Sequence, residues 1–151
     1  MLTHRLARPE DADALLAIAR EAYAGYIPAI GRRPAPMDAD YAAHIRDDTV
    51  FVLSDGAVGE LAGFAVVIDT GEGFVLDNLA VAGAWRGRGC GARLIALVEA
   101  FIAARADRYT LYTNAVMTRN AAWYRRLGFR ETGRATVDGF DRIFFEKTLS
   151  R

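Results

Sequence analysis

A run of β-forming residues that continues through a glycine-rich loop into a helix constrains the fold of this chain most. The run is Leu76–Val81, the loop is Arg86–Gly91, and an apolar helical pattern follows to about Ala106. Free N–H groups at the start of such a helix, together with the helix dipole, form an anion-binding site, and Arg86 and Arg88 add positive charge. A tight turn between a strand and a helix uses the same glycines, so that structural alternative stays open.

Two common phosphate-binding motifs do not match this loop. The P-loop requires a Lys after its last glycine, and the loop contains no Lys. The dinucleotide-binding motif Gly-x-Gly-x-x-Gly requires two residues before its third glycine, whereas only Cys90 separates Gly89 from Gly91. The loop is therefore neither a P-loop nor a dinucleotide-binding motif.

Hydrophobic periodicity and turn signals give the order of the other elements. Helices are expected from Pro9 to about Tyr23, in a short segment that ends near Asp47, after the glycine-rich loop, and at Asn120–Leu127. Strands are expected at Leu2–Arg8, Val50–Ser54, Leu61–Ile68, Phe74–Val81, Tyr109–Thr113, Arg130–Val137 and Phe140–Leu149. The segment from Tyr23 to Tyr41 is expected to be irregular, because several Gly and Pro residues interrupt it. This order predicts one α/β domain, residues 1–151, built on a mixed sheet.

Composition excludes several classes of protein. Nineteen basic and nineteen acidic residues cancel, so no net charge attracts nucleic acid or an anionic membrane. The longest apolar run, Leu61–Ile68, is too short to cross a bilayer, and the N-terminus has no signal-peptide pattern. One cysteine, Cys90, cannot form an internal disulfide, and two histidines cannot by themselves build a zinc site. These observations predict a cytoplasmic protein with no metal, nucleic-acid or membrane partner.

Two motifs resemble one family. Arg-x-x-Gly-x-Gly at residues 86–91, after a strand that ends at Val81, resembles the acetyl-CoA pyrophosphate loop of the GNAT superfamily of N-acetyltransferases. Asn114 after a strand, followed by residues 120–129, resembles the family's Asn-x-x-Ala-x-x-x-Tyr-x-x-x-Gly-Phe region, with its small residue at Ala121 or Ala122. The order of elements resembles the family fold along essentially the whole chain, least between Tyr23 and Tyr41.

The resemblance implies a twisted, mixed and mostly antiparallel sheet of about six to seven strands, flanked by about four helices. Acetyl-CoA, the co-substrate, is expected between the strand that ends at Val81 and the parallel strand Tyr109–Thr113. Its pyrophosphate would bind the N–H groups of residues 88–92, and its pantetheine arm would pair with residues 79–81 like an added strand. A backbone N–H of Leu79 or Val81 would stabilise the thioester oxyanion. The expected cofactor-binding residues are Leu79, Ala80, Val81, Arg86, Gly87, Arg88, Gly89, Cys90, Gly91, Ala92, Asn114, Asn120 and Tyr124.

Tyr124 is the candidate general acid. In the family a tyrosine at this position of the helix often protonates the leaving thiolate, and Tyr124 matches it. The alternative is a buried core tyrosine, because Trp123, Tyr124 and Leu127 also form an apolar stripe. Asn114 and Asn120 are candidates for binding the cofactor's amides, with roles as a turn residue and an N-cap as the alternatives.

Asp77 is the candidate general base, since the attacking amine must lose a proton. Strand alternation would put Asp77 on the same face as Leu79 and Val81, beside the expected acetyl site. Some relatives use a glutamate on this strand. An Asp77 that is solvated or ion-paired, with no role in catalysis, is the alternative.

The segment between Tyr23 and Tyr41 lies where the family places the acceptor side of its cleft. The candidate acceptor-binding residues are Tyr26, Arg32, Arg33 and Met37. The paired arginines favour an amine that also carries a carboxylate, because guanidinium groups bind carboxylates in a bidentate manner. Asp38 and Asp40 would instead attract a cationic amine such as a polyamine. A solvated loop whose charges face water is the alternative.

The sequence therefore predicts an acetyl-CoA-dependent N-acetyltransferase that acts on a primary amine of a small molecule by direct attack in a ternary complex. A non-catalytic sensor that binds acyl-CoA is one alternative. Another is acetylation of proteins, including ribosome-associated acetylation in which an Arg-rich surface binds RNA, because eighteen of the nineteen basic residues are Arg. An edge strand in the hairpin after Phe140 would allow a homodimer.

Overall fold

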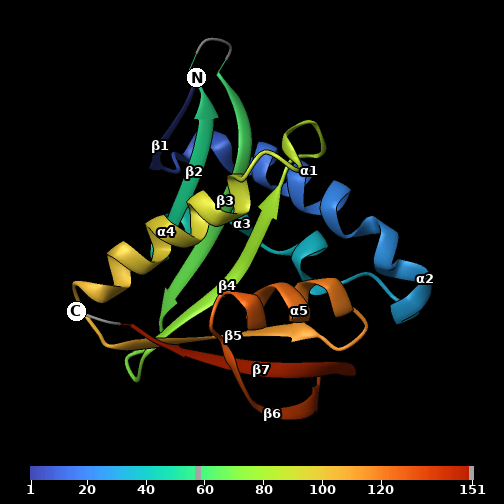
Figure 1. Ribbon diagram of the computed structural model, residues 1–151. Coiled ribbons are helices and arrows are strands. Elements are labelled where there is room, and N and C mark those ends of the chain that lie inside the picture. Colours follow the sequence, from blue (N-terminus) through green and yellow to red (C-terminus); the bar gives the residue numbers. More distant parts are fainter. Residues whose placement is uncertain (57–58, 150–151) are drawn as a thin grey trace.

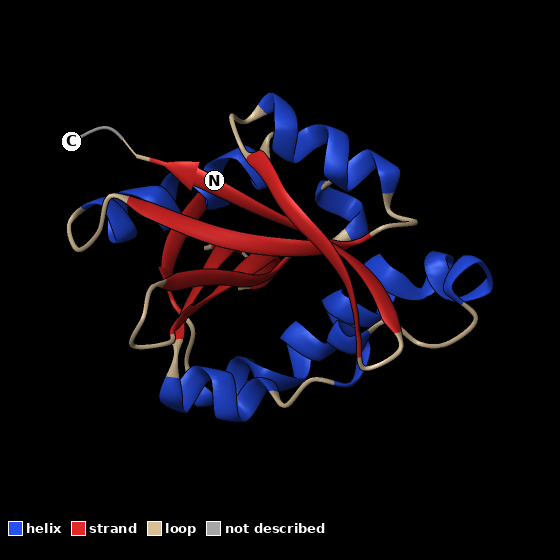
Figure 2. Ribbon diagram, turned by 90° about the horizontal axis from the view of Figure 1, so that it is seen from below, coloured by secondary structure: helices blue, strands red, loops and turns tan. Residues whose placement is uncertain are grey.

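The structure is a computed structural model that describes residues 1–56 and 59–149, and residues 57, 58, 150 and 151 of the expected domain lie outside it. Its described strands form one seven-stranded sheet in the order β1-β2-β3-β4-β5-β7-β6, with helices on both faces (Figures 1 and 2). The strands are β1 (Leu2–Leu6), β2 (Thr49–Asp55), β3 (Glu60–Asp69), β4 (Phe74–Val81), β5 (Arg108–Asn114), β6 (Arg130–Val137) and β7 (Phe140–Thr148). The helices are α1 (Ala12–Tyr23), the single turn α2 (Ile27–Ile30), α3 (Tyr41–Asp47), α4 (Cys90–Ala103) and α5 (Thr118–Arg126).

The sheet is mixed and mostly antiparallel, which confirms the predicted fold class. Among the described strands, β4 and β5 are the parallel neighbours, and every other neighbouring pair is antiparallel. Helix α4 connects these two parallel strands across one face of the sheet (Figure 1). None of the helices in the described part of the chain has the length and apolar character needed to span a bilayer.

Helix α4 covers one face of the sheet. Its apolar stripe, which includes Leu94, Val98 and Ile102, is buried against β-strand residues such as Val67 and Leu111. On the other face, α1 and α3 bury residues 64 and 66 of β3 in a second core cluster. Because both faces of β3 are covered, Leu61 to Val67 are all buried, which explains the continuous apolar run in the sequence.

Strands β4 and β5 diverge soon after they meet. They pair only through Val75 and Leu76 of β4. The next residue, Asp77, is the extra residue of a β-bulge, since Leu76 and Asn78 pair with consecutive residues of β3. A bulge bends the strand and increases its local twist. Strand β5 meanwhile stays paired with β7 as far as Asn114, so β4 leaves its neighbour and an open strand edge results.

The segment between α1 and α3 consists of short helical turns, where the sequence predicts irregular structure. Helix α2 lies between two 3₁₀ turns, Ala24–Tyr26 and Ala35–Asp38. Gly31 ends α2 in the left-handed conformation, with φ of 85°, which a residue without a Cβ adopts at little cost.

A chain of buried hydrogen bonds attaches this segment to β4. The Tyr41 hydroxyl donates to the Pro36 carbonyl oxygen at 2.7 Å and accepts from Asn78 Nδ2 at 2.6 Å. The Tyr23 hydroxyl donates to Asn78 Oδ1 at 3.0 Å. We refer to these groups of Tyr23, Asn78, Tyr41 and Pro36 as the Tyr–Asn network. It fixes the C-terminal end of α1 and the turn at Pro36 relative to the bulged part of β4.

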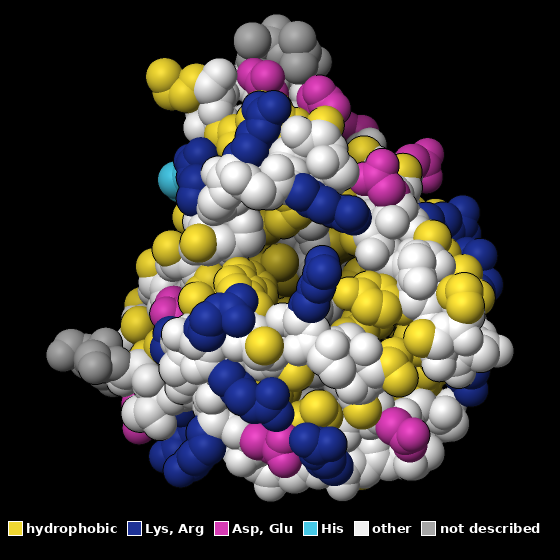
Figure 3. Space-filling model, turned by 45° about the vertical axis from the view of Figure 1, so that its right-hand side comes forward, with side chains coloured by type: hydrophobic (Ala, Val, Ile, Leu, Met, Phe, Trp, Pro, Cys, Tyr) yellow, Lys and Arg dark blue, Asp and Glu magenta, His cyan; other side chains and the backbone are white. Residues whose placement is uncertain are grey.

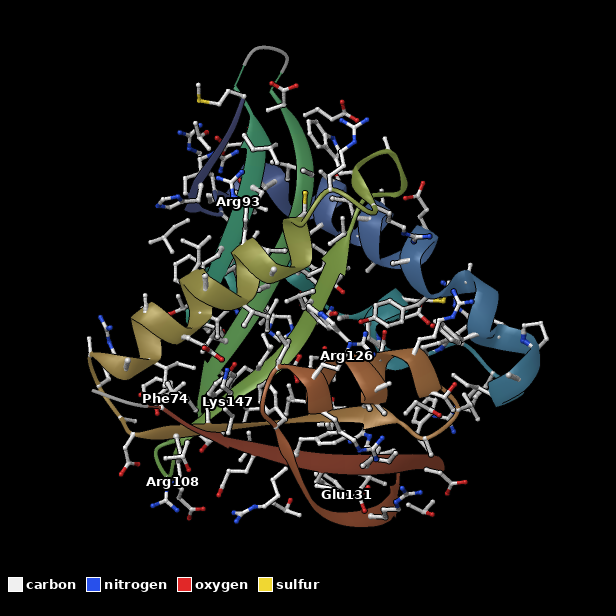
Figure 4. All side chains as sticks on the ribbon, in the orientation of Figure 1. Phe74, Arg93, Arg108, Arg126, Glu131 and Lys147 are labelled. Carbon is white, nitrogen blue, oxygen red and sulfur yellow. The ribbon has the colours of Figure 1, made fainter. Side chains whose placement is uncertain are left out.

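Helix α4 is also attached to the strands beneath it by polar contacts. Glu99 accepts a hydrogen bond from the Tyr109 hydroxyl at 2.7 Å and forms an ion pair with Lys147 at 2.8 Å. Lys147, the only lysine of the sequence, is labelled in Figure 4 between α4 and the strands. These contacts hold the C-terminal half of α4 on β5 and β7.

The close approach of β3, β4 and α4 generates a prediction at Gly63. A Cβ at this position would lie 2.8 Å from the Ala80 carbonyl oxygen and 3.2 Å from Leu94 Cδ1. We expect Gly63→Ala to lower the free energy of unfolding by about 1–3 kcal/mol, because backbone atoms must shift to admit the methyl group. Urea denaturation of both proteins measures this difference.

The matched control is Gly133→Ala on the edge strand β6. A Cβ there meets no atom within 4 Å, so the stability of this variant should stay within about 0.5 kcal/mol of the parent protein. Equal losses of stability in the two variants would contradict the steric explanation.

Candidate active site

Two adjoining hollows occupy the opening between β4 and β5. The hollow that ends at the glycine-rich loop, here the loop-side groove, is lined by Ala22, Tyr23, Tyr26, Leu79, Ala80, Val81, Arg86, Gly91, Arg119, Asn120 and Trp123. The hollow beneath the β6–β7 hairpin, here the hairpin-side cavity, is lined by Tyr23, Pro34, Ala35, Pro36, Leu76, Asp77, Asn78, Leu79, Tyr112, Thr113, Asn114, Met117, Asn120, Tyr124, Phe140 and Arg142. Figure 3 shows the molecular surface hollowed at its centre, with hydrophobic side chains inside and Lys and Arg side chains around it.

The groove and the cavity meet at three shared residues, Tyr23, Leu79 and Asn120. These residues come from α1, β4 and α5, three elements that are far apart in the sequence. Ligands that enter from the two sides would therefore approach each other at Leu79.

The free edge of β4 presents its peptide groups to this meeting point. The Ala82 N–H donates to the Ala62 carbonyl oxygen of the β3 side at 2.8 Å. Because peptide directions alternate along a strand, the N–H groups of Leu79 and Val81 point the other way, into the opening. The Tyr23 hydroxyl shares its proton between Asn78 Oδ1 at 3.0 Å and the Leu79 carbonyl oxygen at 3.3 Å, which fixes the edge at this point.

The glycine-rich loop has the geometry of an anion site. Gly87 and Gly89 have φ of 74° and 78°, in the left-handed region that favours glycine. The first hydrogen bond of α4 runs from Arg93 N–H to the Gly89 carbonyl oxygen at 3.1 Å, so the N–H groups of residues 90–92 have no partner within the helix. These donors fit a pyrophosphate group such as that of acetyl-CoA.

The other residues expected at the loop have different surroundings. Arg86 lines the groove, whereas the guanidinium of Arg88 stacks on the Trp85 ring at 4.9 Å from its centre. Cys90 is buried in the core. A Cβ at Gly91 would lie 3.2 Å from the Trp123 ring, so glycine at this position allows α4 and α5 to approach closely. Ala92 is exposed one residue later.

Tyr124 lies both in the hydrophobic core and at the wall of the hairpin-side cavity. Its ring packs in the core, with ring centres 5.6 Å from Phe129 and 6.2 Å from Phe145. Tyr124 also lines the hairpin-side cavity, and no described side chain forms a hydrogen bond with its hydroxyl. Burial raises the pKa of Tyr124 to about 12, so the phenol keeps its proton at neutral pH.

The two asparagines lie beside Tyr124. Asn114 Oδ1 accepts from the Val116 N–H at 3.1 Å, so Asn114 has the turn geometry that the sequence left open. The N-cap alternative for Asn120 is wrong, because α5 begins earlier and its N-cap is Met117. Asn120 instead lies within the first turn of α5 and faces both hollows.

The bulge changes the expected direction of Asp77. Leu79 and Val81 pack on the α4 side of the sheet, but Asp77 faces α3, with an oxygen 3.8 Å from His44 Nε2. Simple alternation therefore gives the wrong face, because the bulge adds one residue to β4. His44 Nδ1 lies 2.8 Å from an oxygen of Asp48, so the imidazole bridges the two carboxyl groups.

The carboxyl group of Asp77 is partly desolvated in the cavity. Burial is the main cause that raises its pKa, and Asp48 acts in the same direction. His44, Arg142 and the Tyr112 hydroxyl lower the pKa of Asp77 and partly compensate. Asp77 therefore lines the cavity and also contacts His44, so its position is compatible both with a catalytic role and with the alternative of a charge-paired residue.

The four candidate acceptor-binding residues do not line the hairpin-side cavity. Tyr26 lines the loop-side groove, and Met37 is buried in the core. Arg33 is exposed and forms two hydrogen bonds of 2.9 Å with Asp38. Arg32 stacks on Phe140, 3.7 Å from the ring centre. The helical turns of this segment direct residues 34–36 into the cavity instead.

Several residues that line the two hollows are not predicted from the sequence as site residues. Tyr112, Phe140, Arg142 and Trp123 line the two hollows, and His44 contacts Asp77. The Asp-Gly turn and strand alternation offered a signal that residues 140 and 142 share one face of β7. No signal in the sequence brings His44 to β4.

Comparisons with known proteins agree with this architecture. The family model of the acetyltransferase (GNAT) domain matches residues 46–131. A solved nourseothricin acetyltransferase is 25% identical, with a TM-score of 0.74 and 99% of both chains covered. The ribosomal-protein-S18-alanine N-acetyltransferase from Escherichia coli is 23% identical, with a TM-score of 0.78, and 100% of this chain and 96% of that one are covered.

A third similar structure is that of Arabidopsis thaliana NAA60 in complex with acetyl-CoA, which is 20% identical, with a TM-score of 0.73 and 98% of both chains covered. No curated protein sequence matches the chain. The match of the GNAT family model covers more than half of the 151 residues, and it includes β4, the glycine-rich loop, α4 and α5. The chain belongs to the GNAT family of acetyltransferases.

Proposed function

We propose that residues 1–151 form a single N-acetyltransferase domain that moves the acetyl group of acetyl-CoA to a primary amine of a small molecule. The observation that carries the proposal is the meeting of the loop-side groove and the hairpin-side cavity at Leu79. One ligand on each side of this residue forms a ternary complex, in which the amine attacks the thioester directly.

Acetyl-CoA binds in the loop-side groove in this proposal and supplies the activated acetyl group. The charged side chains among the described lining residues are Arg86 and Arg119, both cations, which suits a cofactor rich in phosphate. The N–H groups of residues 88–92 bind the pyrophosphate, and those of Leu79 and Val81 bind the pantetheine arm and polarise the thioester carbonyl. The A. thaliana relative NAA60 was solved with acetyl-CoA, in agreement with this assignment. Asn114 and Asn120 bind the amides of the arm.

Tyr124 donates a proton to the sulfur as the thiolate leaves. The pKa of its phenol, raised to about 12 by burial, keeps this proton available at neutral pH. The same low-dielectric surroundings also destabilise a thiolate, so they make the leaving sulfur a stronger base.

Asp77 accepts the proton that the amine loses when its nitrogen forms the new bond to carbon. Burial raises the pKa of this carboxyl group and so makes the carboxylate a stronger base. The N–C bond forms, the C–S bond breaks with its electron pair on sulfur, and Tyr124 supplies the proton for the free thiol. His44 contacts Asp77 on the side away from the cavity, and Asp48 contacts His44 in turn.

A small-molecule acceptor agrees with the walls of the cavity. Residues 34–36 and Phe140 line it from two segments, and the contact between Arg32 and Phe140 joins these segments. One similar structure is named for nourseothricin and another for the alanine of ribosomal protein S18, so the small-molecule assignment rests on the cavity walls. Release of CoA thiol from acetyl-CoA in the presence of a panel of amines and of peptides with free N-termini tests the proposal. Binding of acetyl-CoA without turnover would favour a sensor, and turnover of peptides alone would favour protein acetylation.

Gly89→Val tests the cofactor loop. The left-handed φ of 78° strains any residue with a Cβ, so the loop must shift and misplace its N–H donors. We expect the acetyl-CoA Kd to rise about tenfold to 100-fold, the cost of one or two charge-assisted hydrogen bonds. Isothermal titration calorimetry measures it. Gly71→Val is the matched control, because Gly71 has φ of 83° in the open β3–β4 turn. A similar loss of affinity in both variants would remove the loop from the site.

Tyr124→Phe tests the general acid. We expect kcat to fall by about 100-fold to 10,000-fold with little change in acetyl-CoA affinity, because only the hydroxyl is removed. Single-turnover kinetics measure the chemical step. Tyr109→Phe is the control, since it removes another buried hydroxyl, bonded to Glu99 and outside both hollows. Wild-type chemistry in the Tyr124 variant would overturn its assignment.

The raised pKa of Asp77 predicts the direction of the pH dependence. Acidification protonates the carboxylate, so kcat/KM should decrease as the pH is lowered. The midpoint of this decrease should lie at a pH above the ordinary carboxyl pKa of about 3.9, because the pKa of Asp77 is raised. Asp77→Asn should lower kcat/KM by about 100-fold or more and abolish this limb of the profile. An unchanged rate and profile in the variant would show that another group or water takes the proton.

A further inference from the structure

Two opposite charges face the hairpin-side cavity. Among the described lining residues, Asp77 of β4 and Arg142 of β7 are the ones with charged side chains. The remaining lining residues are uncharged and mostly aromatic or apolar. Both side chains are half-buried. A cavity with one anion and one cation in such surroundings selects ligands by charge, because a partly desolvated charge is stabilised by a partner of opposite sign.

Arg142 has no carboxylate partner in the part of the chain that the structure describes. The interactions of its guanidinium there are with the Tyr112 ring, 4.1 Å from the centre, and with the Phe140 ring at 5.9 Å. Some arginines on the outer surface pair with a carboxylate, as Arg130 does with Glu146 at 3.2 Å, and others, such as Arg126, have no such partner among the described residues. Arg142 differs from this second group because it lines the cavity.

The aromatic contacts of Arg142 leave its N–H donors available. No hydrogen bond joins these donors to another group among the described residues. These donors form the fork that binds a carboxylate through two parallel hydrogen bonds. Arg142 is therefore held in place by aromatic contacts and is ready to bind an anion.

Asp77 and Arg142 line the same cavity but form no ion pair with each other. The positive charge of Arg142 lowers the pKa of Asp77. An oxygen of Asp77 lies 3.8 Å from His44 Nε2, and no ion pair joins Asp77 to Arg142 among the described residues. Two opposite charges on the walls of one cavity suit a ligand that carries a cation at one end and an anion at the other.

We propose that the acceptor is a primary amine that also carries a carboxylate, such as a free amino acid, with its carboxylate bound by Arg142 and its amine beside Asp77. This inference rests on the proposed acetyl transfer and names the substrate class for that same site. The ammonium of the acceptor first releases one proton to solvent and becomes a neutral amine, which attacks the thioester. The amine then passes a second proton to Asp77 as the N–C bond replaces the C–S bond, and Tyr124 protonates the leaving sulfur. Arg142 thus determines specificity and takes no part in bond making.

Arg32 positions this part of the cavity without touching it. Its guanidinium packs on Phe140, and it occupies the space that a Cβ at Gly139 would need, 2.7 Å from Arg32 Nη1. Phe140 in turn lies beside Arg142. The segment between α1 and α3 therefore acts on the acceptor side by fixing the β6–β7 hairpin rather than by binding the acceptor through Arg32 or Arg33.

The experiment compares matched acceptors. CoA release is measured with saturating acetyl-CoA for the common amino acids, β-alanine and 4-aminobutyrate, and for their carboxamides, which keep the amine and lose the negative charge. We expect the parent enzyme to prefer at least one amino acid over its amide. Arg142→Gln should raise the KM for that amino acid by about tenfold to 100-fold, the loss of a charge-assisted pair. The kcat/KM for the amide should change much less, through the effect of Arg142 on the pKa of Asp77 alone, and the KM for acetyl-CoA should stay unchanged.

Two further variants separate charge from structure. Arg142→Lys keeps the charge but loses the planar fork, so it should retain part of the preference for the amino acid. Arg108→Gln makes the same change in charge at an exposed residue, paired with Asp107 and outside both hollows, and should leave the preference unchanged. Arg108 is labelled at the lower edge of the molecule in Figure 4.

The outcomes distinguish the inference from the proposed function. Equal use of amino acids and amides, or the same preference in Arg142→Gln as in the parent, would overturn the role of Arg142 while acetyl transfer stands. Acetylation only of amines without a carboxylate would do the same. A protein that binds acetyl-CoA but acetylates no amine would overturn both the acceptor class and the transferase activity. Failure to bind acetyl-CoA would overturn the proposed function itself.

Discussion

The bulge at Asp77 ends the parallel pairing of β4 and β5, because the extra residue bends β4 away from a strand that β7 holds along its length. The free edge of β4, the groove beside it and the cavity beyond it all follow from this divergence. In a regular sheet the N–H groups of Leu79 and Val81 would donate hydrogen bonds to the neighbouring strand. Here they remain available for a ligand, and the same bulge turns the Asp77 side chain toward the cavity.

The Tyr–Asn network keeps the opening from collapsing. Buried polar groups are costly unless they are hydrogen-bonded, and the hydroxyls of Tyr23 and Tyr41 and the amide of Asn78 satisfy one another. No described side-chain N or O atom is fully buried without a partner. The network therefore fixes α1 and the turn at Pro36 at a definite distance from β4, and the open strand edge stays accessible between them.

Burial gives the site its chemical character. Desolvation raises the pKa values of Tyr23, Tyr41 and Tyr124, so these phenols stay neutral and serve as hydrogen-bond or proton donors. The charges that remain in the two hollows are few, with cations beside the groove and one charge of each sign in the cavity. This distribution suits a polyanionic ligand on one side and a zwitterion on the other.

The sequence determined much of this by itself, because the relevant signals are local. Periodicity and turn residues predicted the strands, α1, α4 and α5 and the mixed sheet. The spacing of Gly89 and Gly91 before a helix predicted an anion site, since those residues lie next to one another in the chain. The position of Tyr124 on its helix likewise followed from the motif around it.

Only the tertiary structure decided which side chains face the acceptor. A bulge depends on the pairing of two strands, so alternation along β4 alone put Asp77 on the wrong face. The eighteen arginines are alike in the sequence, yet ion pairs hold Arg33 at the surface and ring contacts hold Arg142 in the cavity. His44 reaches Asp77 from another element. These contacts join residues that are distant in the chain, and a single sequence carries no local signal for such pairs.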